Sequence, residues 1–142
     1  MRHKLRWRLS TFMLIVAAAG IVTWLKAPEW SRAYRTWLAD RATNNLLDTP
    51  MPFDHPDGVP LYEFTIEASR RTSGAAFPKG LPIHIDPEGL QANDITIAAM
   101  VKINSQDAPL RRSLEHVLDQ LDLSYRVDAG VVMITSKSLA KP

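Results

Sequence analysis

The sequence predicts an α+β protein in which an N-terminal transmembrane helix and a juxtamembrane helix precede one small folded domain. Three observations lead to this class. A long uncharged apolar segment lies near the N-terminus. From about Pro50 onward, the apolar residues alternate between helical and strand periodicity. The chain has 142 residues, of which 46% are hydrophobic and 23% charged, which suits one compact domain with short accessory segments.

The predicted anchor is an apolar helix over residues 9–25, preceded by a basic N-terminus over residues 1–8. A helix of this length spans about 25 Å, slightly less than a hydrocarbon core of about 30 Å. Trp7 and Trp24 lie at its two ends, where indole rings favour the headgroup region. The apolar anchor residues are Leu9, Phe12, Leu14, Ile15, Val16, Ile21, Val22, Trp24 and Leu25.

Three interpretations of this segment compete. A buried core helix is disfavoured because the segment is apolar on every side. A cleaved signal peptide is supported by the small residues Ala17–Gly20, but the apolar run continues to Leu25. A retained signal anchor fits best, and the basic residues before the helix favour a cytoplasmic N-terminus with the remainder exported. We therefore expect a single-pass protein of the inner membrane with a periplasmic C-terminal domain.

A second helix is predicted within residues 26–49, which also form the linker to the domain. Its apolar positions recur with the spacing of one helical face, and three of them are aromatic: Trp30, Tyr34 and Trp37. An aromatic stripe beside an anchor indicates a helix that lies in the membrane interface or packs on a neighbour. The alternative is a stalk that only spaces the domain from the bilayer.

The folded domain is predicted over residues 50–137, with residues 138–142 as a tail. Prolines at 50, 52, 56 and 60 mark a linker that enters it, in which Met51 and Phe53 begin an edge strand. A helix over 60–72 follows, with Leu61, Phe64, Thr65 and Ala68 on its core face. A strand over 81–86, a turn over 87–89 and a strand over 99–103 come next.

The strongest helix signal lies after Asp107, the expected N-cap, and its core stripe is Leu110, Leu114, Val117, Leu118 and Leu121. A β-hairpin closes the domain, with strands over 124–127 and 131–135. The predicted order is (β)-α-β-β-α-β-β, with two helices packed on one face of a small sheet.

These residues resemble the secretin and TonB N-terminal (STN) domain. The similarity is carried by Ala108–Val127 and Val131–Ile134, with an upstream match at Val59–Leu61 and Leu81–Leu90. It covers about Pro52 to Ser136, roughly 60% of the chain. Asp122 replaces a glycine that the family usually has, and aspartate tolerates the left-handed conformation; Thr65 replaces a typical leucine.

The resemblance implies a non-catalytic adaptor that docks other proteins of the bacterial envelope. Secretins continue into a ring-forming β-domain and receptors into a plug and barrel. Neither follows in this sequence, so we expect the chain to form no pore or receptor by itself.

Charge and composition exclude several other functions. Through residue 49 there are eight Lys and Arg against three Asp and Glu, whereas the remainder has nine against twelve. The domain is therefore mildly acidic, although a nucleic-acid-binding domain needs a basic face, so we expect no nucleic-acid partner. The sequence contains no cysteine, which excludes disulfides and cysteine-ligated zinc.

No motif of catalysis, cofactor binding or metal binding is found, so we expect no enzyme, no cofactor, no metal and no small-molecule substrate. The strongest chemical candidate is His116 with Asp119, three residues apart on one helix, and we interpret both as solvated surface. His84, between two strand isoleucines, and His55, in the proline-rich segment, are interpreted as structural or solvated.

Two hypotheses therefore lead. In the first, the domain is an anchored adaptor that takes up a partner by strand addition, at Met51–Phe53 or at the Val131–Thr135 strand. In the second, the anchor and the aromatic helix drive self-association and the domain is a spacer. An envelope enzyme that uses His116 and Asp119 is a third, weaker alternative. The lipid bilayer is the expected partner of the N-terminal helix in each.

Overall fold

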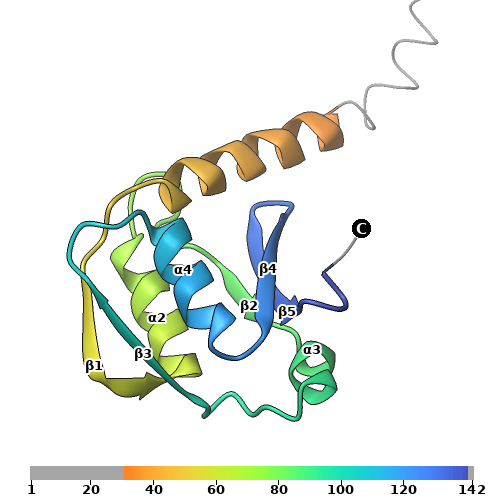
Figure 1. The fold of residues 1–142 in the computed structure, drawn as a ribbon. Helices are drawn as coiled ribbons and strands as arrows, with labels where there is room; N and C mark the ends of the chain where they lie inside the picture. The colour runs from red at the N-terminus through yellow and green to blue at the C-terminus, as the bar shows by residue number, and fades with distance from the viewer. Residues whose placement is uncertain (1–30, 141–142) are drawn as a thin grey trace, which may run out of the picture. The chain divides into compact units, whose positions relative to one another are not determined.

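The computed structural model describes residues 31–140, so the predicted membrane helix over residues 9–25 and Trp30 lie outside the described part. Among residues 31–140, no helix has the length and apolar character needed to cross a bilayer. A compact unit that begins at Thr36 holds a mixed α+β fold (Figure 1). This unit begins inside the segment predicted as juxtamembrane helix and linker.

The predicted order of elements is confirmed, with one addition. A helix covers residues 31–47. The following elements are β1 (Phe53–Pro60), α2 (Leu61–Arg71), β2 (Ile83–Ile85), α3 (Pro87–Ala92), β3 (Met100–Ser105), α4 (Leu110–Asp119), β4 (Leu123–Asp128) and β5 (Val131–Ser136). The additional element is α3. The proline-rich segment that we interpreted as a linker with an edge strand contains β1, and Pro56 and Gly58 lie within the irregular register between His55 and Val59.

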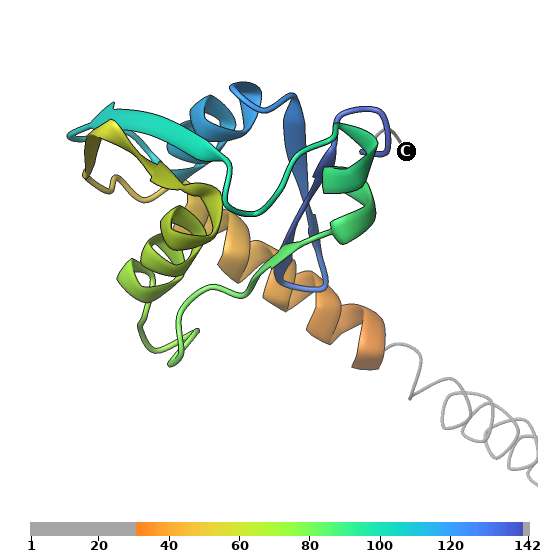
Figure 2. The same cartoon turned by 90° about the horizontal axis from the view of Figure 1, so that it is seen from below.

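The strands form two sheets, so the prediction of two helices on one small sheet is wrong. β1 pairs with β3 in antiparallel fashion, while β5 lies between β2, which is parallel to it, and β4, which is antiparallel. Figures 1 and 2 show α2 and α4 between the two sheets. The chain before β3 bonds to the start of α2, through Leu61 N to Ala99 O and Tyr62 N to Ile97 O, which places β3 beside β1 instead of β2.

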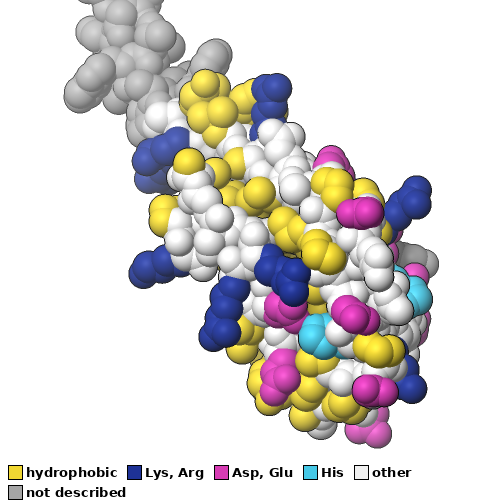
Figure 3. Space-filling model, turned by 90° about the vertical axis from the view of Figure 1, so that its left-hand side faces the viewer, with side chains coloured by type: hydrophobic (Ala, Val, Ile, Leu, Met, Phe, Trp, Pro, Cys, Tyr) yellow, Lys and Arg dark blue, Asp and Glu magenta, His cyan; other side chains and the backbone are white. Residues whose placement is uncertain are grey.

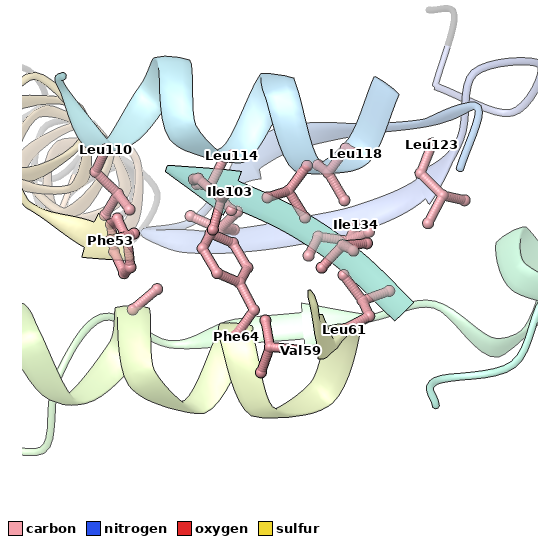
Figure 4. Close-up of a cluster of buried hydrophobic side chains, with 14 of the residues drawn as sticks. Phe53, Val59, Leu61, Phe64, Ile103, Leu110, Leu114, Leu118, Leu123 and Ile134 are labelled. Carbon is pink, nitrogen blue, oxygen red and sulfur yellow. The ribbon is translucent and has the colours of Figure 1, made fainter. Parts of the chain in front are cut away.

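The core lies between α2 and α4, where buried side chains of both helices meet Ile103 of β3 and Ile134 of β5 (Figure 4). The predicted core face of α2 is confirmed, because Leu61, Phe64, Thr65 and Ala68 are all buried. The stripe of α4 is confirmed at its first four positions, and Leu121 is partly buried after the helix ends. Thr65, the polar member, donates its hydroxyl to Tyr62 O at 2.8 Å, which satisfies it inside the core.

Two local predictions are wrong. Asp107 is not the N-cap of α4: Pro109 holds that position, and no side chain caps the helix. The first N–H of α4, on Leu110, instead donates to the carbonyl of Thr49 at 3.1 Å, so a neighbouring segment replaces the cap. The predicted turn at Pro87 is the first turn of α3, whose N-cap Asp86 accepts a hydrogen bond from Glu88 N.

The turn of the β4–β5 hairpin contacts the helix over residues 31–47. Ala129 and Gly130 have φ of 51° and 83°, which gives the two left-handed residues of a tight hairpin turn. Gly130 N donates to Asp40 Oδ1 at 2.7 Å, and Thr43 Oγ1 donates to Gly130 O at 2.8 Å. A side chain at residue 130 would begin 2.8 Å from Ala39 Cβ. Residues 39–47 are therefore part of the folded domain.

Candidate functional site

A polar groove lies between α4 and β4 and is the strongest candidate for a functional site. It has a volume of about 350 Å³. One wall is formed by the consecutive β4 residues 123–127, and the opposite wall by α4 through Arg111, Glu115 and Asp119. Asn44, from the helix over residues 31–47, lies at one end. The groove thus brings together three segments that are far apart in the sequence.

The β4 wall of the groove belongs to the edge strand of the three-stranded sheet. β4 pairs with β5 on one side, in a register that runs from Leu123–Ser136 to Asp128–Val131. In β5, the N–H of Val132 and the carbonyl of Ile134 form hydrogen bonds with residues on the β2 side. The main-chain N–H and C=O groups of the odd-numbered β5 residues therefore point toward β4. Because pairing groups alternate along an antiparallel strand, residues 124, 126 and 128 of β4 bond to β5.

It follows that the backbone groups of Leu123, Tyr125 and Val127 point away from the sheet. Within the described part of the chain, no backbone or side-chain group bonds to them. Unpaired N–H and C=O groups in a row along an edge form a template for another strand. The groove therefore has one wall that accepts an extended peptide through its main chain.

Arg111 fixes the geometry of the groove. Its Nε donates to Asp48 Oδ1 at 2.9 Å, while its terminal nitrogens donate to Asn44 Oδ1 at 3.1 Å and to the Tyr125 hydroxyl at 3.2 Å. The hydrogen bond to Asp48 raises the pKa of Arg111. Burial raises the pKa of Tyr125, although Arg111 acts in the opposite direction. One guanidinium thus joins the helix over residues 31–47, α4 and β4.

The two strand-addition sites expected from the sequence are unavailable in the structure. Val131–Thr135 lies within β5, the central strand, which is paired on both sides. At Met51–Phe53, the N–H of Met51 donates to Ala108 O at 3.0 Å, and Pro52 O accepts from Arg71 at 2.7 Å. The hairpin predicted from sequence is correct, but its other strand provides the free edge.

The predicted aromatic stripe is exposed on the helix over residues 31–47. Tyr34 and Trp37 are 62% and 51% exposed, Leu38 is 42% exposed, and the guanidinium of Arg41 lies 5.3 Å from the Trp37 ring centroid. Trp30 and the anchor residues lie outside the described part. The stripe and the domain-facing residues Thr43 and Leu47, both fully buried, occupy different faces of this helix.

The described histidines lie on three different elements: His55 on β1, His84 on β2 and His116 on α4. His116 and Asp119 are exposed, and Asp119 Oδ1 bonds to Lys137 Nζ at 2.9 Å. His84 is exposed on β2, as its position between two isoleucines indicated. No group of three or more His, Asp and Glu in the described part is arranged to hold a metal. Figure 3 shows acidic and histidine side chains interspersed with apolar ones on one face, without a continuous basic surface there.

His55 has a defined partner, which the interpretation as a solvated linker residue missed. Its Nε2 lies 2.7 Å from Glu67 Oε2, and Arg71 bonds to the other oxygen of the same carboxylate. Burial alone would raise the pKa of Glu67, but the hydrogen bonds from His55 and Arg71 outweigh it and lower the pKa. The cluster links β1 to α2 at the surface.

Sequence reasoning missed Arg111, Tyr125 and Asn44 as groove residues. No local pattern singles out Arg111, because its contacts with Asn44, Asp48 and Tyr125 form only in the tertiary structure. The strand predicted over 124–127 corresponds to β4, but the sequence did not indicate which side of that strand remains open. Searches of family models, of curated proteins and of solved structures find no match to this chain.

Proposed function

We propose that this chain is a membrane-anchored, non-catalytic adaptor of the bacterial envelope that binds an extended segment of another protein along β4. The observation that carries the proposal is the unpaired β4 edge beside the groove. The main chain of Leu123, Tyr125 and Val127 would supply affinity by strand addition, and the groove side chains would select the sequence of the partner.

β4 suits this role better than the other edge of the same sheet. β2 has three residues, and the bonds of Pro82 and Asp86 to β5 leave only Ile83 and Ile85 facing outward. β4 has six residues, of which three have outward-facing main-chain groups. The groove beside it contains positively charged side chains, Arg111 and Arg126, and a negatively charged one, Glu115. A partner strand therefore gains more main-chain bonds and more polar contacts at β4.

The envelope location rests on the sequence. The uncharged segment over residues 9–25, with basic residues before it, supports a retained anchor with the domain exported. The resemblance of Pro52–Ser136 to the STN domain supports an adaptor that serves a secretion or signalling assembly. Both arguments are independent of the β4 edge.

Self-association is the second candidate function, and the exposed stripe of Tyr34, Trp37 and Leu38 favours it. Aromatic side chains grouped on one helix face suit a protein interface or the membrane interface. In this case the domain would act as a spacer. If this helix face drives self-association, replacing all three residues by Ser abolishes oligomers. If the adaptor proposal holds, the same variant still captures a partner at β4.

Site-specific photocrosslinking tests the adaptor proposal. A photoreactive amino acid at Arg126, an exposed β4 residue, is compared with the same group at Arg70, an exposed residue of α2, in the full chain in the membranes of its native host. We expect one defined protein adduct from position 126 and none of the same mass from position 70. Equal adduct patterns from both positions, or no protein adduct at position 126, would refute docking at β4.

A further inference from the structure

A second pocket lies between β3 and α4 and shares no residue with the groove at β4. It has a volume of about 210 Å³. Ile103, Asn104, Ser105 and Ala108 line it from the β3 side. Arg112, Ser113 and His116 line it from α4. Its lining therefore combines apolar side chains with a small set of hydrogen-bonding groups.

Two buried hydroxyls in this pocket have no hydrogen-bond partner among the described residues. They are Ser113 Oγ and Ser105 Oγ. Ser113 is 2% exposed and lies on the core side of α4, beside Leu114. A buried hydroxyl without a partner lowers stability, and alanine at this helical position would avoid that loss while keeping the packing. The hydroxyl of Ser113 is therefore suited to a ligand and not to the fold.

The guanidinium of Arg112 and the imidazole of His116 also line the pocket. Arg112 and His116 form no side-chain hydrogen bond or ion pair within residues 31–140. No Asp or Glu lines the pocket. The guanidinium and both serine hydroxyls can act as donors, so the arrangement favours an acceptor that carries negative charge.

The volume and the apolar lining narrow the choice of anion. A volume of about 210 Å³ holds several water molecules, and the side chains of Ile103 and Ala108 offer such waters no hydrogen bonds. A phosphate would bring two charges to a pocket with one permanent cation, Arg112. A carboxylate with a short apolar tail matches both the donors and the apolar lining.

We propose that this pocket binds a carboxylate with a short apolar tail, held by Ser113, Ser105 and Arg112. The carboxylate has two possible sources, a free short-chain acid or the C-terminus of a protein chain. This site is independent of the β4 edge, and it adds a small-ligand function that the sequence did not predict. No bond joins Ser113 Oγ to His116, so the pair forms no nucleophile and base, and the proposal is one of binding.

Titration of the full chain in detergent micelles with isobutyrate tests the proposal, with isobutyramide as the neutral counterpart. We expect isobutyrate to raise the melting temperature and to shift the NMR signals of Ile103 and Ala108, while isobutyramide binds at least tenfold more weakly. Ser113→Ala and Arg112→Gln should each weaken isobutyrate binding at least tenfold. Ser73→Ala and Arg70→Gln, at exposed positions outside the pocket, should leave it unchanged.

The Ser113→Ala protein remains informative because we expect it to melt higher than the wild type without ligand. A short peptide that ends in valine, as free acid and as amide, separates the two sources. Tighter binding of the free-acid peptide than of isobutyrate identifies a protein C-terminus, and the reverse identifies a free acid. Equal binding of isobutyrate and isobutyramide, equal binding by wild type and both pocket variants, or no binding by either acid would overturn the proposal.

Discussion

Replacing Ser113 by alanine should stabilise the domain, although most substitutions of buried residues destabilise proteins. Ser113 is 2% exposed, and its hydroxyl lacks a partner among the described residues. Burial of an unpaired hydroxyl costs about 1–3 kcal/mol. Alanine also has the higher helix propensity, by roughly 0.5 kcal/mol. The expected gain in the free energy of unfolding is therefore at least about 1.5 kcal/mol.

For a domain of this size, a gain of about 1.5 kcal/mol raises the melting temperature by roughly 6 °C or more. Thermal unfolding of the full chain, followed by circular dichroism, measures it. Thr72→Val is the matched control, because the Thr72 hydroxyl is buried and bonded, donating to Ser69 O at 2.6 Å and accepting from Leu81 N at 2.8 Å. We expect Thr72→Val to lower the melting temperature. A Ser113→Ala protein that melts at or below the wild-type temperature would refute the reasoning.

Three further predictions concern the helix over residues 31–47, the His55–Glu67–Arg71 cluster and the core. Gly130→Ala should destabilise the domain by about 1–2 kcal/mol because residue 130 has a positive φ, and the new Cβ should add a further loss through contact with Ala39. In a double-mutant cycle, Ala39→Gly should recover the loss that is due to this contact. Gly74→Ala, with nothing near its Cβ, should be nearly neutral. Additive effects of Gly130→Ala and Ala39→Gly would contradict that contact. The pKa of Glu67 in the folded state lies below its ordinary value of 4.5. The stability that the ionised Glu67 contributes is therefore fully present above pH 4.5 and is lost as the pH falls through the lowered pKa. Glu67→Gln should therefore unfold with a shallower dependence on pH below about 4.5, and an unchanged slope in acid titration would argue against the cluster. Leu114→Ala should cost about 2–5 kcal/mol in denaturant unfolding because Leu114 is fully buried between the helices, and a loss below about 1 kcal/mol would contradict its central position.

The elements that could be predicted from the sequence are those with a clear local pattern of apolar or turn residues. The helical stripe that begins at Leu110 and the hairpin turn at Asp128–Gly130 depend on residues close in the chain, and both elements formed as expected. Asp122 adopts a φ of 54°, in the left-handed region that aspartate tolerates better than most residues.

The remaining features could not be predicted because they depend on contacts between residues that are far apart in the sequence. The separation into two sheets depends on the hydrogen bonds that the N–H groups of Leu61 and Tyr62, at the start of α2, donate to the carbonyls of Ala99 and Ile97. No local sequence pattern predicts these bonds. The replacement of Asp107 as N-cap depends on the distant carbonyl of Thr49. The groove is also a tertiary feature, because Arg111 acquires its role only when Asn44 and Tyr125 are folded against it.

The proposal that β4 binds a partner strand is tested most directly by removing one outward N–H. Val127→Pro deletes an N–H that points away from β5, and edge strands tolerate proline at such positions. Val127→Ala controls for the loss of the side chain. Both proteins carry the photoreactive group at Arg126, and circular dichroism verifies that each is folded. We expect Val127→Pro to reduce the partner adduct at least tenfold and Val127→Ala to retain it within about twofold. Equal adduct yields from the two folded variants would contradict strand addition at β4.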